Sequence, residues 1–490
     1  MEYYESFPKP PEITYPTGKG EFTFSLAILL CSLGLINCIF FAGYQLGYAI
    51  AQSLCILVTF GYLLASGRKP SLYSGMLLAL SLVITAGCAR SDDGFVKFVM
   101  VCFLFVAINL GLGLQAGQNR RCPHGITSLL DPPSVFFRLG FGKLPEAFRG
   151  IGSAMRNGSA ASKKTGAVLA GLLLSVPLLV IVVLLLVSAD AAFAGLMDKL
   201  PRLDVAELVI TVIFGCSVAC VLYTRGAALR HAKPAPLPQK YRSGIHPLTV
   251  NTVLVMVCLV YMVYLFSQLA YFAGGLAGIL PDGYTLAEYA RRGFFEMGWL
   301  CAINLGIMSL GVGLVKKSGK TPLSTRLFCL FIGLITLFFV VTASAKMAMY
   351  IGSYGLTRLR VLTEVIMVFL GISTIVLCIW LFAPKLAYMK VILLVALVMG
   401  AAVLWTDVDT VVARHNVQAY RSGQLAQVDV DYLESLSAGA VPYIAQLAAD
   451  GNKAAQIFME QNHSQDYWHA SLHDLRSWNW ADWLAGRLWE

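Results

Sequence analysis

The sequence predicts an all-α protein, a polytopic bundle of about eleven transmembrane helices with a small helical domain after the last span. Three observations predict this fold. First, 57% of the 490 residues are hydrophobic and 13% are charged, against roughly 25% charged residues in soluble domains. Second, apolar runs long enough to cross the hydrocarbon core of a bilayer recur within residues 22–406. Third, residues 407–490 are acidic and rich in tryptophan, which marks them as a separate domain.

The expected spans follow one another from residue 22 onward. Residues 1–21 carry four glutamates and several prolines, unlike a signal peptide, so the first apolar run is expected to remain as a span. The second and eleventh runs are marginal in length. The spans cover residues 22–43, 47–65, 72–89, 95–116, 166–188, 205–224, 248–274, 294–315, 326–346, 361–383 and 390–405.

Basic residues set the expected orientation, because Lys and Arg accumulate in cytoplasmic loops. The N-terminal segment and the loops on its side carry 23 of the 37 Lys and Arg residues, the opposite loops carry 9 and the tail carries 5. The N-terminus is therefore expected in the cytoplasm, and the odd number of spans places residues 407–490 outside. This asymmetry explains the formal charge of +10, so no nucleic-acid partner is expected.

The loop 117–165 is the longest on the expected cytoplasmic side and carries eight basic residues against two acidic ones. A polybasic segment beside a span is attracted to anionic lipid headgroups, and the apolar side chains within residues 135–141 suit an interfacial face. Two interpretations stay open. The loop contacts the headgroups of the lipid bilayer, or it docks a cytoplasmic or membrane protein partner.

The tail combines helical patterning with clustered tryptophans. Asp429 or Ser435 is suited to cap short helices in the stretch 429–449, where apolar residues recur at helical intervals. Five of the eight tryptophans lie within residues 468–489, and tryptophan prefers membrane interfaces and partly wet cores. The end of the chain is therefore expected to fold back onto the membrane domain.

Ionisable residues inside spans are costly, so each one is a candidate for a functional site. The first cluster enters the eighth span, where Glu288, Arg292 and Glu296 are spaced i, i+4, i+8 and share one stripe of a helix. Asn304 lies about 80° further round the same helix. Three more polar residues close in sequence complete this candidate ligand-binding set: Gln268, Tyr271 and Tyr289.

Two further clusters lie at the start of the tenth span and after the eleventh. Arg360 and Glu364 are i, i+4 neighbours and are expected to form an ion pair. Asp407 and Arg414 are seven residues apart, hence on one helix face, with Asp409 close by. All three clusters are expected on the outer side of the membrane. Each is either a set of buried salt bridges that fixes helix packing or a site for a substrate, an ion or a proton.

Signatures of soluble enzymes are missing from the sequence. It contains no GxxxxGK[ST] phosphate loop and no HExxH helix. Eleven of the twelve cysteines lie within or beside expected spans, which gives neither a disulfide framework nor paired metal ligands. No metal site is assigned, the cofactor stays unknown, and a non-enzymatic protein is expected.

Several motifs carry a family resemblance. A Gln-x-x-Tyr-x-x-Gly-Gly run begins at Gln268, and a Tyr-Ala-Arg-Arg-Gly-Phe-x-Glu entry into a span begins at Tyr289. SADAAFAGL begins at Ser188 and DVDTVVARHNVQAY at Asp407. Together these segments resemble a bacterial family of polytopic membrane proteins whose domain has no assigned function. The resemblance implies the helical fold, a bacterial plasma-membrane location and the importance of residues 268–304, but no substrate.

The sequence thus predicts a transporter-like permease or a membrane accessory or sensor component, with a polar site in the outer half of the seventh, eighth, tenth and eleventh spans. The alternative is a membrane-embedded transferase that acts on lipid-linked substrates at the outer face. That activity needs an exposed carboxylate as general base or metal ligand, and the candidates are Glu288, Glu296, Asp407 and Asp409.

Overall fold

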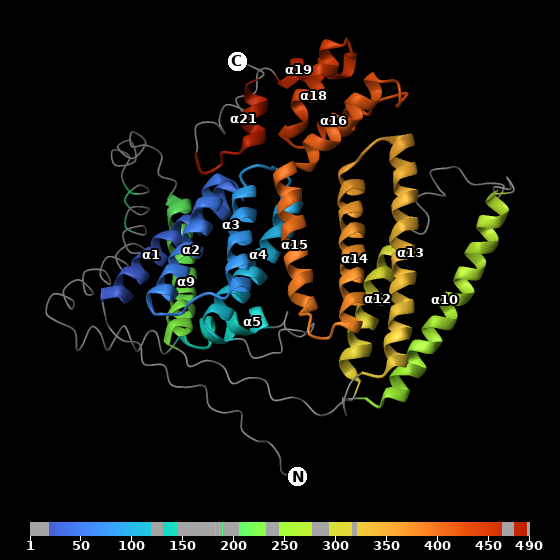
Figure 1. The fold of residues 1–490 in the computed structure, drawn as a ribbon. Coiled ribbons are helices and arrows are strands. Elements are labelled where there is room, and N and C mark those ends of the chain that lie inside the picture. The colour runs from blue at the N-terminus through green and yellow to red at the C-terminus, as the bar shows by residue number, and fades with distance from the viewer. Residues whose placement is uncertain are drawn as a thin grey trace. The chain divides into compact units, whose positions relative to one another are not determined.

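The computed structural model describes residues 19–118, 131–144, 182, 186, 189, 205–231, 245–276, 294–315, 321–462 and 475–487. These residues form helices and connecting turns, and the one β-bridge among them pairs Ile245 with Val315 (Figure 1). Nine of the described helices are long and apolar enough to cross a membrane. The prediction of an all-α, multi-pass membrane protein is therefore confirmed for the described part of the chain.

The chain forms two compact units, and the first contains the N-terminal helices. Within it α1 packs along α9, and α3 packs along α4. The short helices α5 and η3 pack against α4 and α9, respectively. The helices of unit 1 are α1 (Lys19–Asn37), continued by the π-helical turn η1 (Cys38–Ala42), α2 (Leu46–Ala65), α3 (Leu72–Gly87), α4 (Gly94–Gln115), α5 (Asp131–Phe136), η3 (Phe137–Phe141) and α9 (Val205–His231).

Polar contacts at both ends of unit 1 show that α1 and α9 run antiparallel. At one end, His231 lies 3.0 Å from the carboxylate of Glu21. At the other end, Asn37 donates a hydrogen bond of 2.7 Å to Glu207. We call these the Glu21 end and the Glu207 end of unit 1.

Unit 2 contains five apolar helices and the C-terminal domain. Buried side chains such as Met308, Cys329 and Phe339 fill the core between α10, α12, α13 and α14. The helices are α10 (Pro247–Leu276), α12 (Phe294–Leu314), α13 (Leu323–Tyr354), α14 (Arg358–Phe382), α15 (Tyr388–Thr406), α16 (Val408–Arg421), α17 (Val430–Glu434), η4 (Ala438–Ala440), α18 (Val441–Ala449) and α19 (Lys453–Asn462).

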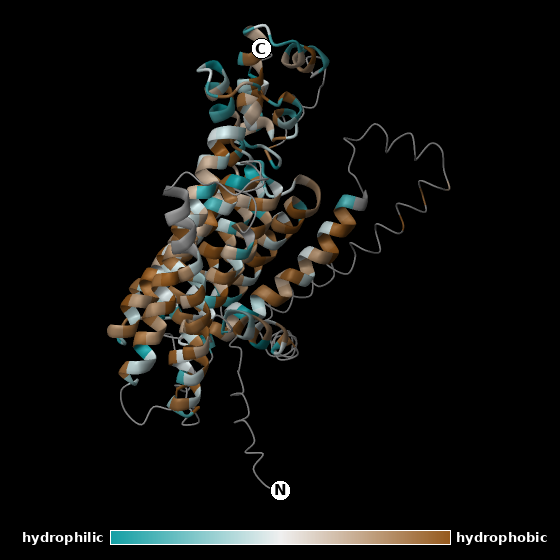
Figure 2. Ribbon diagram, turned by 90° about the vertical axis from the view of Figure 1, so that its right-hand side faces the viewer, coloured by the Kyte–Doolittle hydropathy of each residue, from teal (hydrophilic) through white to brown (hydrophobic). Residues whose placement is uncertain are grey.

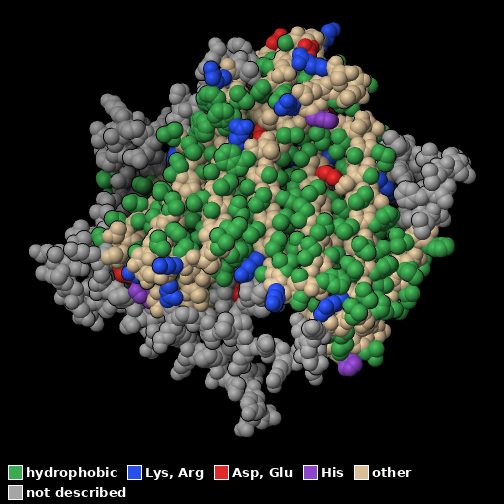
Figure 3. Space-filling view, viewed as in Figure 1, with side chains coloured by type: hydrophobic (Ala, Val, Ile, Leu, Met, Phe, Trp, Pro, Cys, Tyr) green, Lys and Arg blue, Asp and Glu red, His purple; other side chains and the backbone are tan. Residues whose placement is uncertain are grey.

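Hydropathy separates the spans of unit 2 from its C-terminal domain. The spans are mostly hydrophobic, whereas polar residues are frequent in the helices after Thr406 (Figure 2). Large apolar side chains on the spans point outward, for example Phe266 at 79% and Leu334 at 56% exposure (Figure 3). The C-terminal domain has its own small core, which includes Val417, Leu433 and Leu447. An apolar exterior on the spans and a polar exterior on the domain fit one part in lipid and one in water.

Several predicted boundaries differ from those of the structure. The third expected span is the 16-residue helix α3, which is shorter than the nine candidates, and the span expected at 166–188 lies outside the described residues apart from three single positions. The ninth span continues to Tyr354 rather than ending at residue 346. Asp429 caps α17 as expected, by accepting a hydrogen bond of 2.9 Å from the Tyr432 amide. Ser435 instead follows the last residue of α17, so it caps no helix start.

Candidate functional site

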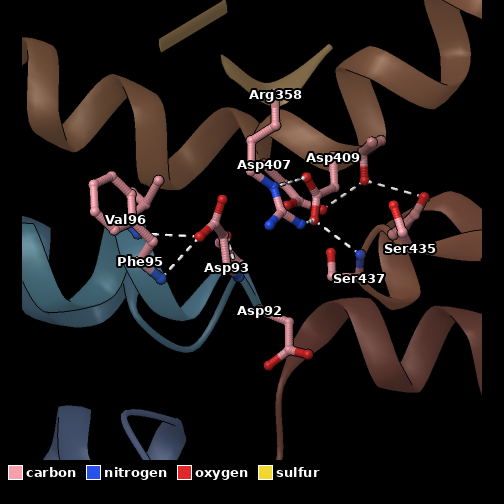
Figure 4. Close-up of polar contacts among 12 residues, drawn as sticks. Asp92, Asp93, Phe95, Val96, Arg358, Asp407, Asp409, Ser435 and Ser437 are labelled. Atoms are coloured by element: carbon pink, nitrogen blue, oxygen red, sulfur yellow. Dashed lines mark hydrogen bonds and ion pairs between the residues drawn. The ribbon is translucent and has the colours of Figure 1, made fainter. Parts of the chain in front are cut away.

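An ion pair between a buried carboxylate and a partly exposed arginine joins the first residue of span α14 to the C-terminal domain. Arg358 donates two hydrogen bonds to Asp409, from Nε at 2.7 Å and from Nη2 at 2.5 Å (Figure 4). The Ser437 amide donates a third, of 2.9 Å, to the same carboxylate. Asp409 is fully buried. A guanidinium that grips a carboxylate through two donors fixes orientation as well as distance, so this pair holds α16 against α14.

Backbone contacts reinforce the same junction. The Leu356 amide donates to Asn416 Oδ1 at 2.7 Å, and Asn416 Nδ2 donates to the Leu356 carbonyl at 2.8 Å. The Arg358 amide donates to the Tyr432 hydroxyl at 2.7 Å. Asp407 is buried with a φ of 51° and accepts a hydrogen bond of 2.6 Å from Thr410. We call this set of contacts the Arg358–Asp409 junction.

The ion pair expected between Arg360 and Glu364 is absent from the described residues. Arg360 turns back to the carbonyl groups of Tyr354 and Gly355 and lies over the ring of Tyr350, so it does not pair with Glu364. Glu364 Oε2 is buried without a hydrogen-bond partner. The carbonyl groups at the end of α13 have no partner within their own helix, so they compete with the Glu364 carboxylate for the Arg360 side chain. Here Arg360 donates to these carbonyl groups instead of to Glu364.

The prediction that Asp407 and Arg414 share one helix face is also wrong. Its side chain is exposed on α16, whereas the carboxylate of Asp407 is buried and contacts Thr410. Asp407 precedes the first residue of α16 and has a non-helical backbone, so the seven-residue spacing does not place it on the face of Arg414. Asp409 instead pairs with Arg358, a residue of the cluster at the start of the tenth span, so the structure brings parts of two predicted clusters together.

The first cluster is separated along α12. Glu296 is exposed at the start of this helix. Asn304 is fully buried, where it accepts a hydrogen bond of 2.6 Å from Tyr261 and donates one of 3.0 Å to Thr336. Asn304 therefore serves helix packing. The other members are not placed: Gln268 and Tyr271 lie on α10 without described side chains, and Glu288, Tyr289 and Arg292 lie outside the described residues.

A second polar centre, not predicted from the sequence, lies at the Glu207 end of unit 1. Lys97 is 2% exposed although it sits in the first turn of span α4. Its Nζ donates to Gln45 Oε1 at 2.7 Å and lies 3.7 Å from the Asp92 carboxylate. Gln45 also donates to Asp92 at 2.7 Å, which closes the set. We call these three residues the Lys97 centre.

The end of the chain docks beside the Lys97 centre. The Leu46 and Gly47 amides donate to the carbonyls of Trp478 and Arg476, both at 3.1 Å, and the Trp480 amide donates to Ala89 at 3.0 Å. These contacts confirm, for the described part of the tail, that the chain folds back onto the membrane domain. A side chain at Gly47 would meet the Arg476 backbone at 2.9 Å, so the approach requires glycine.

Docking buries a carboxylate close to two other charges. Asp482, on the short helix α21 (Trp480–Gly486), accepts a hydrogen bond of 2.5 Å from Asn479. Burial and the negative charge of Asp92 together raise the pKa of Asp482 to about 7, against the opposing effects of Asn479 and Lys97. Asp482 thus changes protonation near neutral pH, which no pattern in the sequence indicated.

Comparison with known proteins identifies the family. Residues 30–447 match the model of a family described as "Domain of unknown function (DUF4153)". The chain belongs to this family. The DUF4153 match includes the Arg358–Asp409 junction and Lys97 but ends before the docked segment 475–483. The searches of curated proteins and of solved structures gave no match. Among the described residues of this DUF4153 protein, no group of three His, Cys, Asp or Glu is arranged to hold a metal ion.

Proposed function

We propose that this DUF4153 protein is a membrane accessory or sensor component of the bacterial plasma membrane, whose C-terminal domain receives a partner outside the membrane. The observation that carries the proposal is the Arg358–Asp409 junction. The two hydrogen bonds from Arg358 to the fully buried carboxylate of Asp409 fix the position of α16 relative to α14. A change imposed on the domain would therefore be transmitted to a span.

The charge distribution supports the orientation. The basic residues favour a cytoplasmic N-terminus and an outer location for the domain after Thr406. The loop 117–165, with its basic residues, then faces anionic headgroups or a cytoplasmic partner. On this topology the Arg358–Asp409 junction lies at the outer end of α14, as expected of an element that couples the domain to a span.

The test is photocrosslinking in intact cells, with a crosslinking amino acid at the exposed positions Val411 or Gln418 of α16. We expect one discrete adduct with another membrane or secreted protein. Asp409→Asn should lower its yield several-fold at equal abundance in the membrane, because the domain loses its fixed position. The control Asp431→Asn, at an exposed carboxylate, should leave the yield unchanged.

A permease is the second candidate, and the Lys97 centre favours it. A buried lysine in a span is costly and is typical of substrate or proton pathways. Cysteines introduced along α4 would then react with a membrane-impermeant reagent from both sides of the membrane. That result, together with the absence of any adduct at α16, would replace the accessory or sensor proposal. The transferase alternative has less support, since Asp407 and Asp409 are buried and hydrogen-bonded.

A further inference from the structure

One arginine in unit 1 lacks the partners that a buried charge needs. Arg225 lies within α9 and is 6% exposed. Its Nη1 donates a hydrogen bond of 2.7 Å to Asn109 on α4, and its guanidinium carbon lies 5.8 Å from the ring centroid of Phe136. Its Nε is buried without a hydrogen-bond partner. No carboxylate of the described residues forms an ion pair with it.

This arrangement leaves a positive charge uncompensated. Arginine keeps its proton in proteins, so Arg225 cannot become neutral to escape the cost of burial. One neutral amide and one aromatic ring return much less free energy than burial of the charge costs. The guanidinium has five N–H donors in a planar fork that matches the oxygens of a phosphate or carboxylate. An anion is therefore the missing partner that the chemistry specifies.

The position of Arg225 indicates which anion can reach it. Arg225 lies six residues before the end of α9, and Asn109 six residues before the end of α4, which places both about 9 Å from the Glu21 end. Arg68 lies at that end, where it donates to the carbonyls of Ala116 and Arg230. A second arginine at the Glu21 end raises the local concentration of anions there. A depth of this size below the helix ends suits a lipid phosphate or a small free phosphate.

We propose that Arg225 and Asn109 form a binding site for a phosphate group, supplied either by an anionic phospholipid or by free phosphate. The site belongs to unit 1 and is independent of the proposed accessory or sensor role. Arg225 supplies the charge and the fork, and Asn109 orients the fork by occupying Nη1. Phe136 covers one face of the guanidinium. The Nε–H group, which has no partner within the protein, is then the donor that contacts the phosphate.

The test compares ligand retention by the full-length protein purified in detergent. Native mass spectrometry reports phosphatidylglycerol added in mixed micelles, with phosphatidylcholine as the neutral lipid, and a thermal shift reports inorganic phosphate. Arg225→Met removes the charge and keeps the length of the side chain. Asn109→Asp supplies an internal counter-ion, so it should fold even if Arg225→Met does not. Lys69→Gln, an exposed charge near the same end, is the control.

We expect the wild type and Lys69→Gln to bind one of the two anionic probes, and both site variants to bind it about tenfold more weakly or less. Retention of phosphatidylglycerol identifies a lipid headgroup, whereas a shift with inorganic phosphate alone identifies a free anion. Equal binding by the wild type and Asn109→Asp would overturn the proposal. So would the failure of the wild type to prefer either anionic probe over phosphatidylcholine.

Discussion

The Arg358–Asp409 junction of unit 2 and the Lys97 centre of unit 1 both lie where part of the chain after Thr406 meets the spans, but they are built differently. Asp409 is fully buried and receives two donors from one guanidinium. Asp92 is 33% exposed at its side chain, and Lys97 approaches it at 3.7 Å. The side chain of Arg358 is 33% exposed and that of Lys97 is 3% exposed. The carboxylate is therefore the buried partner of the junction, whereas the lysine is the buried partner of the Lys97 centre.

The choice of cation explains the difference. Arginine offers a planar fork that locks a carboxylate in one geometry, whereas lysine is a point charge that several acceptors can share. Lys97 is shared by Gln45 and Asp92 and feels the charge of Asp482. When both of these acids are ionised, the group carries one negative charge in excess. The junction is therefore expected to be permanent and the Lys97 centre to respond to conditions.

The largest effect is expected from breaking the Arg358–Asp409 pair. Arg358→Met leaves the buried carboxylate of Asp409 without its cation and should lower the free energy of unfolding of the C-terminal domain by about 3–5 kcal/mol. Pulse proteolysis of the purified protein measures this change. Asp431→Asn, on the exposed face of α17, should have no measurable effect. An equal loss of unfolding free energy in both variants would mean that the Arg358–Asp409 pair stabilises the domain no more than an exposed charge does.

The Lys97 centre should respond to pH through Asp482. An unfolded aspartate titrates near 3.9, and the pKa of Asp482 in the folded protein is about 7. Between these two pKa values the folded state binds more protons than the unfolded state. The contribution of Asp482 to the free energy of unfolding is therefore complete below about pH 4, decreases as the pH rises, and is lost as the pH passes about 7. We expect docking of residues 475–483 to weaken by up to about 4 kcal/mol over that range. Hydrogen exchange of this segment at pH 5 and pH 8 measures it.

Substitution of Asp482 provides the control for the pH effect. Asp482→Asn keeps the size of the side chain and removes its titration, so exchange of the segment should become nearly independent of pH. The charged groups that face Asp482 are Asp92 and Lys97, and Arg90 lies over the adjacent ring of Trp480. An unchanged pH profile in the variant would assign the effect to one of these groups instead.

A smaller effect is expected from the close approach of the chain end to α2. Gly47→Ala places a methyl group against the Arg476 backbone and should destabilise docking by about 1–3 kcal/mol. Gly61 lies on the same helix with no atom near its would-be side chain, so Gly61→Ala should be neutral or slightly stabilising. Protease cleavage within residues 475–483 compares the two variants. Equal cleavage of the two variants would show that Gly47 and the Arg476 backbone are not held as close together as their contact indicates.

The smallest effect is expected at Arg414. This side chain is exposed and makes no ion pair among the described residues. Arg414→Gln should therefore change the unfolding free energy of the C-terminal domain by less than about 0.5 kcal/mol. A clear loss in thermal unfolding would support the predicted placement of Arg414 and Asp407 on one helix face over the observed arrangement.

The sequence predicts most of the fold, because a span is a local property of about 20 residues. It does not predict the partners, which lie far apart in the chain: Asp409 pairs with a residue 51 positions away, and Arg476 contacts one 269 positions away. Hydropathy placed Lys97 and Arg225 at the ends of expected spans, where a basic side chain can reach water. In the structure both side chains are buried, within α4 and α9. The i, i+4 rule failed for Arg360 because nearby carbonyl groups were better acceptors.

The central claim is that α14 and the C-terminal domain are coupled through Arg358 and Asp409. A double-mutant cycle with Arg358→Met and Asp409→Leu measures this coupling in the unfolding free energy of the domain. We expect the double variant to be more stable than the sum of the single losses predicts, by about 2 kcal/mol or more, because Arg358→Met alone leaves the buried carboxylate of Asp409 without its cation. Additive losses within about 0.5 kcal/mol would show that the two residues act independently and would contradict the account.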